Sequence, residues 1–403
     1  MQHVLEKLAA TNPASEIWWD SSPLIYGKWA DGVLKSAPED KRDLWSEQLS
    51  RLLDPATVAS SGEMGFRGVT TNPPLSLQAI KGDPDRWVSR IRALCSEEPS
   101  ATVEEVYWKI YLEVVRDGAA MIRSVWDASN GLYGFVSGQV DPRCVTDYDA
   151  MLEQALSIAA QGPNIMVKAP GSMQGYQIIE EMTARGISTN NTTSFSMPQY
   201  IACMDAVSRG LERAKANNVD LSRWRSVITH MSARLTGLGD MLDQAALRGI
   251  EISPDEAQLA ELAVMKRAYR HTRDTDHPSK MLMCSMRVNK DDGQGGARSL
   301  HIEKLAGGDF VYTCPPSYIS ALMEVEDRLP EFDPNAINEE LPADLYDRLM
   351  RIPFFRQAYE PDGMEPHQFA QFGPFIVTAG EFAKATRQTI DFVAHVMEGA
   401  KHG

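Results

Sequence analysis

Short apolar or β-branched runs alternate along the chain with longer segments in which apolar residues recur three and four positions apart. This alternation predicts parallel strands connected by helices that pack on the sheet. The predicted strands are Glu16–Asp20, Gly65–Thr70, Gly134–Gln139, Asn164–Lys168, Ile187–Thr192, Ser226–Met231, Lys280–Ser285 and Asp309–Thr313. Eight βα units close a (β/α)8 barrel, whereas an open doubly wound sheet commonly has about five or six strands. We therefore expect a TIM barrel.

The helical pattern is clearest in a few of the connecting segments. Asp149–Ala160 and Pro198–Ala214 each carry an apolar face. The sequence SPDE beginning at Ser253 has a capping serine, a proline at the first helical position and a glutamate three residues after the cap, which predicts a helix running to about Arg270. A last helix is predicted near Glu381–Met397.

The 403 residues fit a single barrel domain with additions. We expect one domain over 1–403, with insertions at about 35–63 and 238–278 that lengthen two of the connections. The segment from about 329 to 403 is expected to be a C-terminal extension that wraps the barrel.

Composition narrows the class of protein. No apolar run approaches the roughly 18 residues that span a bilayer, so no membrane association is expected. The net charge of −15 would repel a phosphate backbone, so nucleic acid is not an expected partner. Five widely spaced cysteines without a CxxC pair, and no basic and apolar leader, predict a cytoplasmic protein with reduced thiols. No histidine or cysteine cluster has the spacing of a metal site, and no metal is expected.

Polar side chains stand where most of the predicted strands end, which is where barrel enzymes build their active sites. A turn or a helix cap explains any one of them singly, but together they form a candidate site that includes one lysine. These residues are Asp20, Thr70, Thr71, Asn72, Gln139, Lys168, Asn190, Thr192, Thr229, His230, Ser285 and Arg287.

Lys168 is the most informative of these residues. It follows the apolar run Ile165–Val167, so its amine is expected inside the barrel mouth. Desolvation disfavours the charged form and would lower the lysine pKa toward about 7 to 8, which frees the amine to attack a carbonyl. The alternative is a structural ion pair with Asp20, although buried ion pairs tend to be costly.

Three segments are similar to motifs of transaldolases: IMVKAPGSMQG around Lys168, GVTTNPP at 68–74 and GISTNNTTSFS at 186–196. WWDSS with Asp20, FVSGQVDPR at 135–143, MSAR with Arg234 and LMCSMR with Arg287 follow in the same order. The chain thus resembles the transaldolase family from about residue 16 to 316. Its insertions and tail are similar to those of the longer, actinobacterial-type members.

The resemblance implies a cofactor-free Schiff-base enzyme of carbohydrate metabolism, such as the pentose phosphate pathway, that acts on sugar phosphates as a monomer or homodimer. It implies that Lys168 forms the imine, that Asp20 takes the proton of the C4 hydroxyl and that Thr192 binds the catalytic water. It also implies binding residues: Thr71, Asn72, Asn190, Thr229 and Ser285 for the substrate, and Arg234 and Arg287 for its terminal phosphate.

The sequence departs from the family pattern at Gln139, where transaldolases have a glutamate that shuttles protons through a water. An amide can orient that water but cannot accept its proton, so about 10²- to 10⁴-fold of acid–base help would have to come from elsewhere. Fructose-6-phosphate aldolases also have glutamine there, with a tyrosine on strand six where this chain has Met231. His230 and Met231 should point to opposite faces of their strand, with His230 a structural residue.

Several functions therefore stay open. The first is a transaldolase-like transfer of a three-carbon ketol unit. An aldolase, or a pathway-specific enzyme acting on an unusual sugar, is the alternative that Gln139 favours. A sugar-phosphate-binding protein without turnover is a third possibility, which the presence of both Lys168 and Asp20 disfavours. A metal-dependent hydrolase is disfavoured because histidines are rare at the strand ends.

Overall fold

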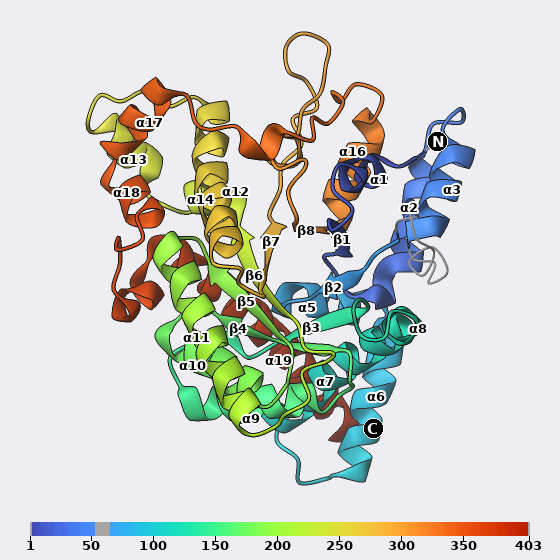
Figure 1. Ribbon diagram of the computed structural model, residues 1–403. Helices are drawn as coiled ribbons and strands as arrows, with labels where there is room; N and C mark the ends of the chain where they lie inside the picture. The colour runs from blue at the N-terminus through green and yellow to red at the C-terminus, as the bar shows by residue number, and fades with distance from the viewer. Residues whose placement is uncertain (1, 53–64, 402–403) are drawn as a thin grey trace.

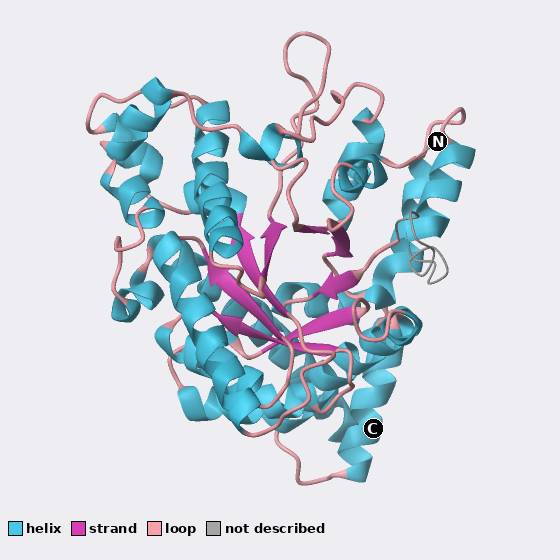
Figure 2. Cartoon of the chain, in the orientation of Figure 1, coloured by secondary structure: helices cyan, strands magenta, loops and turns pink. Residues whose placement is uncertain are grey.

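The computed structural model describes residues 2–52 and 65–401. Eight parallel strands form a closed barrel in which each strand pairs with its neighbours in chain order, and β1 pairs with β8. The strands lie at the centre and helices surround them (Figures 1 and 2). The strands are β1 (Glu16–Trp19), β2 (Gly68–Thr70), β3 (Phe135–Gln139), β4 (Ile165–Pro170), β5 (Thr189–Ser194), β6 (Ser226–Met231), β7 (Lys280–Cys284) and β8 (Val311–Cys314). The predicted TIM barrel is confirmed.

The helices that lie before β5 are α1 (Val4–Ala10), α2 (Tyr26–Ser36), α3 (Arg42–Leu52), α5 (Pro73–Gly82), α6 (Pro84–Glu97), α7 (Val103–Met121), α8 (Arg123–Ala128), α9 (Tyr148–Ala159) and α10 (Met173–Ala184). The later helices are α11 (Met197–Ala216), α12 (Ser232–Gly237), α13 (Met241–Ala246), α14 (Pro254–Asp274), α15 (Leu300–Glu303), α16 (Pro316–Val325), α17 (Ala343–Met350), α18 (Pro353–Tyr359) and α19 (Gly373–Lys401). Short 3₁₀ helices are η1 (Pro23–Ile25), η2 (Pro142–Cys144), η3 (Ala336–Asn338) and η4 (Pro366–Gln371).

Two strands end two residues later than the sequence predicts, and the other strands end within one residue of the predicted position. β4 continues past Lys168 to Pro170, because Ala169 and Pro170 pair with Asn191 and Thr192. A proline is tolerated at a strand end since its missing N–H removes no interior ladder bond. β5 likewise continues past Thr192 to Ser194, across a register shift.

The helix that begins after Ser253 has the predicted capping box, and it continues to Asp274, beyond the predicted end at Arg270. The last helix begins at Gly373 and not near Glu381. Its first turns contain glycine, proline and β-branched residues, which are weak helix formers, and packing overrides that local preference.

The segments predicted as additions connect to the barrel as follows. Residues 238–278 contain α13 and α14, and α14 packs against α12, α15 and β7. Within 35–63 the structure shows the end of α2 and all of α3, whereas 53–64 lie outside the described residues. After residue 329, α17 and α18 pack near α13 and α14, while α19 contacts α5, α6, α7 and β5 (Figure 1).

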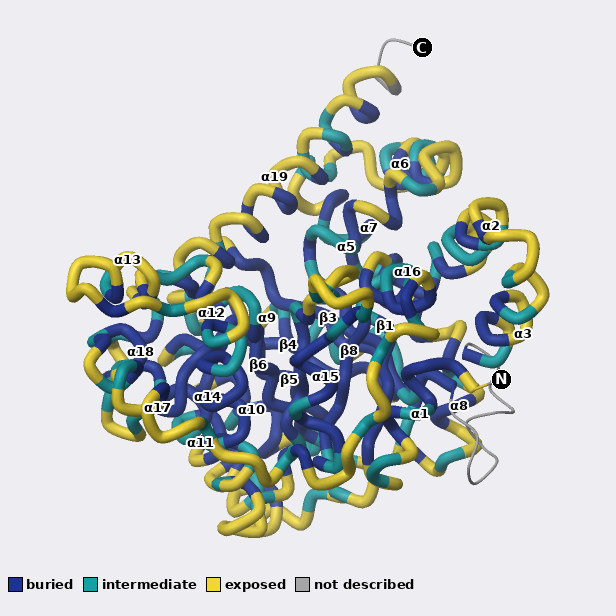
Figure 3. Tube along the Cα trace, turned by 90° about the horizontal axis from the view of Figure 1, so that it is seen from above, coloured by how far each residue is buried: buried dark blue, intermediate teal, exposed yellow. Residues whose placement is uncertain are grey.

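The barrel interior follows from strand alternation. On β1, Glu16 and Trp18 face inward, and Trp19 faces outward against Tyr26 and Phe66. Trp18 lies against Gly68 of β2, where a Cβ atom would be 2.4 Å from the indole ring. Both tryptophans are therefore core residues, and the strands appear as the buried centre of the molecule in Figure 3.

Candidate active site

Lys168 occupies the position that the sequence predicts. It lies on β4 between Gln139 of β3 and Asn190 of β5, and only 5% of it is exposed. Its Nζ donates a hydrogen bond of 2.9 Å to the backbone oxygen of Thr71. Burial lowers the pKa of Lys168, and the negative charge of Asp20 offsets part of that shift. The amine is thus held in the barrel mouth, and a larger fraction of it is neutral than in a free lysine at the same pH.

Asp20 directly follows β1, on the far side of the barrel from β4, and its backbone N–H still bonds to Cys314 of β8. Thr70 of β2 donates a 2.7 Å hydrogen bond to Oδ1 of Asp20. Burial raises the pKa of Asp20, while the charge of Lys168, the bond from Thr70 and the charge of Arg234 act against that rise. The mouth therefore contains a carboxyl and an amine whose pKa values are displaced toward each other.

Asn190 is fixed by a chain of hydrogen bonds across three strands. Thr229 of β6 donates to its Oδ1 at 2.8 Å, and its Nδ2 donates to Oγ of Ser137 on β3 at 2.9 Å. All three side chains are buried. Because the bond from Asn190 to Ser137 passes over β4, it limits the rotamers of the amide beside Lys168.

Gln139 and Thr192 each present a buried polar atom to the mouth. Among the described residues, neither Oε1 of Gln139 nor Oγ1 of Thr192 has a hydrogen-bond partner. The backbone of Gln139 is held by Tyr111 of α7, whose hydroxyl donates to its C=O and accepts from its N–H, both at 2.7 Å. Buried polar groups are rarely left unsatisfied, so two such atoms at a barrel mouth suit a bound water or substrate hydroxyl.

The other predicted substrate-binding residues also have roles in the fold: Thr71 and Asn72 make hydrogen bonds within the protein, and Ser285 forms a turn. Oγ1 of Thr71 donates to the backbone oxygen of Ser137 at 2.6 Å. Oδ1 of Asn72 caps α5 by accepting from the backbone N–H of Leu75 at 2.9 Å, and its Nδ2 takes no part in that cap. Ser285 follows β7 with a φ of 59°, a left-handed conformation that turns the chain at the mouth.

The two predicted phosphate-binding arginines come together at α12, and each is paired with a carboxylate. Arg234 donates to Oε2 of Glu381 on α19 at 2.6 Å. Nη1 of Arg287 lies 3.5 Å from Oε1 of Glu261, and its Nη2 donates to the backbone oxygen of Ala233 at 2.7 Å. The sequence does not predict either carboxylate.

His230 is a structural residue, as predicted. Its Nδ1 contacts the hydroxyl of Tyr200 at 2.5 Å and its Nε2 lies 3.2 Å from the backbone oxygen of Glu261. Burial lowers its pKa to about 3, so it stays neutral at physiological pH. In the part of the chain that the structure describes, no cluster of histidine, cysteine or acidic residues has the arrangement of a metal site.

Some residues that shape the mouth are not predicted from the sequence. Ser137 and Thr313 lie on strands at inward positions, so alternation within FVSGQ and DFVYT is a signal that identifies them. Thr313 shares a hydrogen bond with Thr70. Tyr111 and Glu381 lie on helices, and the sequence around them does not mark them as site residues. Only the fold brings Tyr111 next to β3 and Glu381 next to Arg234 of α12.

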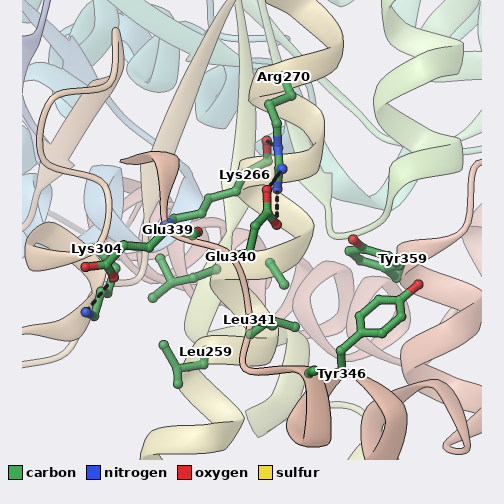
Figure 4. A pocket seen from close by; sticks show the side chains of 12 residues that line it. Leu259, Lys266, Arg270, Lys304, Glu339, Glu340, Leu341, Tyr346 and Tyr359 are labelled. Carbon is green, nitrogen blue, oxygen red and sulfur yellow. Dashed lines mark hydrogen bonds and ion pairs between the residues drawn. The ribbon is translucent and has the colours of Figure 1, made fainter. Parts of the chain in front are cut away.

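A separate cavity of about 350 Å³ lies between α14 and the segment 339–359 (Figure 4). Two lysines line it, Lys266 and Lys304. Lys266 is buried and donates to the backbone oxygens of Ala336 and Glu339, and burial lowers the pKa of Lys266 to about 8. Arg270 pairs with Glu340 beside it. This cavity is on the outside of the barrel, and Lys266 serves to anchor the chain after β8.

Comparisons with known proteins identify the family of this chain. Residues 53–363 match the family described as transaldolase/fructose-6-phosphate aldolase, so the chain belongs to that enzyme family. It is 34% identical to transaldolase 2 of Streptomyces avermitilis over 72% of this chain and 80% of that protein. It is 29% identical to a transaldolase of Thiobacillus denitrificans over 76% of this chain and 88% of that protein.

A third relative is transaldolase 2 of Nostoc punctiforme, which is 27% identical over 72% of this chain and 81% of its own length. The relatives thus come from several bacterial groups, and the actinobacterial-type subgroup stays a prediction. Within the described residues, no helix combines the length and the apolar character that crossing a membrane requires.

Proposed function

We propose that this protein is a Schiff-base enzyme that transfers or releases a three-carbon ketol unit from a ketose, with Lys168 as the nucleophile. The observation that carries the proposal is the buried amine of Lys168, which has a lowered pKa and is electrostatically coupled to Asp20. A desolvated lysine of this kind is the group that forms imines with carbonyl substrates.

The proposed reaction begins when the neutral amine of Lys168 adds to the C2 carbonyl of the ketose. The resulting carbinolamine loses water to give the imine. Asp20 then accepts the proton of the C4 hydroxyl, the C3–C4 bond breaks, and an aldehyde leaves. The electron pair of that bond passes toward the nitrogen of the protonated imine, so the lysine-bound fragment becomes an enamine. The enamine either adds to an acceptor aldehyde or is protonated at carbon, and hydrolysis of the imine that results releases the product and restores the amine of Lys168. The raised pKa of Asp20 makes it an effective proton acceptor and donor.

Gln139 and Thr192 are proposed to hold the water that takes part in dehydration and hydrolysis. Their unpartnered oxygens support this role, since each can bond to one water. The amide of Gln139 orients that water and does not titrate, so Lys168 and Asp20 are the groups proposed to exchange protons with it. Asn190, fixed by Thr229 and Ser137, would bond to a substrate hydroxyl, together with Asn72.

Imine trapping tests the proposal directly, because the chain contains two buried lysines with lowered pKa values, Lys168 and Lys266. Borohydride reduction in the presence of fructose 6-phosphate or dihydroxyacetone is expected to add the mass of one reduced ketose, mapped to the peptide that contains Lys168. Lys168→Met is expected to abolish the adduct, whereas Lys266→Met should retain it. An adduct on Lys266, or none with any ketose despite saturable binding, would favour a sugar-binding protein without turnover.

A second candidate function is that of an aldolase, which the amide at Gln139 favours over ordinary transaldolase turnover. Fructose 6-phosphate supplied alone should release free dihydroxyacetone if the protein is an aldolase. If it is a transferase, turnover should require an acceptor such as erythrose 4-phosphate. Measuring both products with and without the acceptor separates the two functions.

A further inference from the structure

The longest helix of the structure, α19, contributes a carboxylate to the candidate phosphate site. α19 contacts β5, the turn η2 after β3 and helix α12 after β6, which places it beside the carboxyl end of the barrel (Figure 3). From this helix Glu381 accepts the 2.6 Å hydrogen bond of Arg234, and Thr378 lies 3.3 Å from the same nitrogen. The guanidinium also lies over the ring of Phe382.

Arg234 lies in the first turn of α12, three residues after β6 ends at Met231, so it stands at the carboxyl end of the barrel. Its charge is also one of those that lower the pKa of Asp20. An anion bound by Arg234 would therefore lie at the same end of the barrel as Asp20. Glu381 is already paired with the guanidinium of Arg234 in the structure. The terminal group of a substrate therefore has to compete with this carboxylate for Arg234.

The second arginine shows a different kind of pairing. Glu261, the partner of Arg287, is fully buried and also lies 3.0 Å from Nε2 of His301. Thr236 donates to the other oxygen of Glu261. Glu261 is therefore a fixed counter-ion, whereas the side chain of Glu381 is 49% exposed.

We propose that Glu381 is a specificity-determining residue that selects against a dianionic phosphate and favours ketoses whose terminal group is an uncharged hydroxyl. This inference rests on the proposed function. Two arginines and two carboxylates leave no net positive charge at the site, so a phosphate gains little attraction and meets the repulsion of Glu381. A neutral hydroxyl can bond to Glu381 and Arg234 together without breaking their ion pair.

The test compares Glu381→Gln with Glu398→Gln, a control that removes the same charge from an exposed position near the end of the same helix. For each protein, kcat/KM is measured with fructose 6-phosphate and with fructose as the donor. The concentration of each donor that half-saturates borohydride trapping is measured in parallel. Glu381→Gln is expected to raise the preference for the phosphorylated donor about tenfold, the effect of removing roughly 1.4 kcal/mol of repulsion, and Glu398→Gln should leave it unchanged.

The competing possibility is that Glu381 only positions Arg234 for phosphate. Glu381→Gln would then weaken phosphorylated donors, and either this result or an unchanged preference would overturn the inference. Binding of inorganic phosphate, followed by calorimetry, is expected to tighten in Glu381→Gln, and it requires no turnover. Absence of imine trapping with every ketose would refute the proposed function, while tighter phosphate binding would still support the role of Glu381.

Discussion

Burial acts in opposite directions on the two reactive groups at the mouth. It lowers the pKa of Lys168 below 10.5 and raises the pKa of Asp20 above 3.8, and each group opposes the shift of the other. The amine reacts only when neutral, so the rate of imine formation should rise with pH and level off above the lowered pKa of Lys168.

Asp20→Asn is therefore expected to shift this pH profile to lower pH. The carboxylate favours the ammonium form of Lys168, and its removal lowers the pKa of that lysine further. The measurement is the rate of trapping by cyanoborohydride with dihydroxyacetone at a series of pH values. Asp31→Asn, which removes an exposed carboxylate of α2, should leave the midpoint unchanged. A midpoint that rises in Asp20→Asn would show that the two groups are not coupled as the structure indicates.

At the scale of the element, strand alternation accounts for how much of the site the sequence predicts. Once β3, β4, β5 and β6 are recognised, Gln139, Lys168, Asn190 and Thr229 must face the barrel interior, and they do. The ends of β4 and β5 are harder to predict, because cross-strand pairing continues into residue types that usually form turns. Helix α19 is the clearest gap, since its position beside the mouth depends on residues far away in the sequence, such as Arg234, which lies 147 residues before Glu381.

The pairing of β1 with β2 leads to a prediction about packing. Gly68 lies opposite Trp18, and a Cβ atom would be 2.4 Å from the indole, whose ring fills the barrel interior. Gly68→Ala is expected to destabilise the protein by about 1–3 kcal/mol, measured by urea denaturation, because neither the strand nor the ring has room to move.

Gly32→Ala is the matched control for this change. Gly32 lies on the exposed side of α2, with open space around the added methyl group. Alanine should stabilise this helix by roughly 0.5–1 kcal/mol, because it is the better helix former. Equal effects of the two substitutions would show that the contact between Gly68 and Trp18 does not limit the packing of the barrel.

At the scale of the whole molecule, the amino end of the barrel is closed by charges from distant parts of the chain. Glu16 at the start of β1 accepts hydrogen bonds from Arg225, which precedes β6, at 2.7 Å and from Lys280 of β7 at 3.0 Å. Trp18 donates to its other oxygen at 2.9 Å. The candidate active site and this ionic cluster thus lie at opposite ends of the same strands.

Glu16→Gln tests how far this cluster stabilises the fold. Burial raises the pKa of Glu16, but Arg225 and Lys280 outweigh it and lower that pKa from 4.5 to about 2. A lowered carboxyl pKa stabilises the fold above pH 4.5, and this contribution is lost as the pH falls toward 2. The substitution removes the carboxylate partner of Arg225 and leaves Lys280 with Asp309 as its acidic partner, so it should cost about 3 kcal/mol at pH 7 and clearly less at pH 3 in urea denaturation. Asp127→Asn removes the partner of Arg123 in an exposed pair on α8 and should cost less than about 1 kcal/mol at either pH. A cost of Glu16→Gln that does not change with pH would mean that packing around its side chain, and not its charge, holds the amino end of the barrel closed.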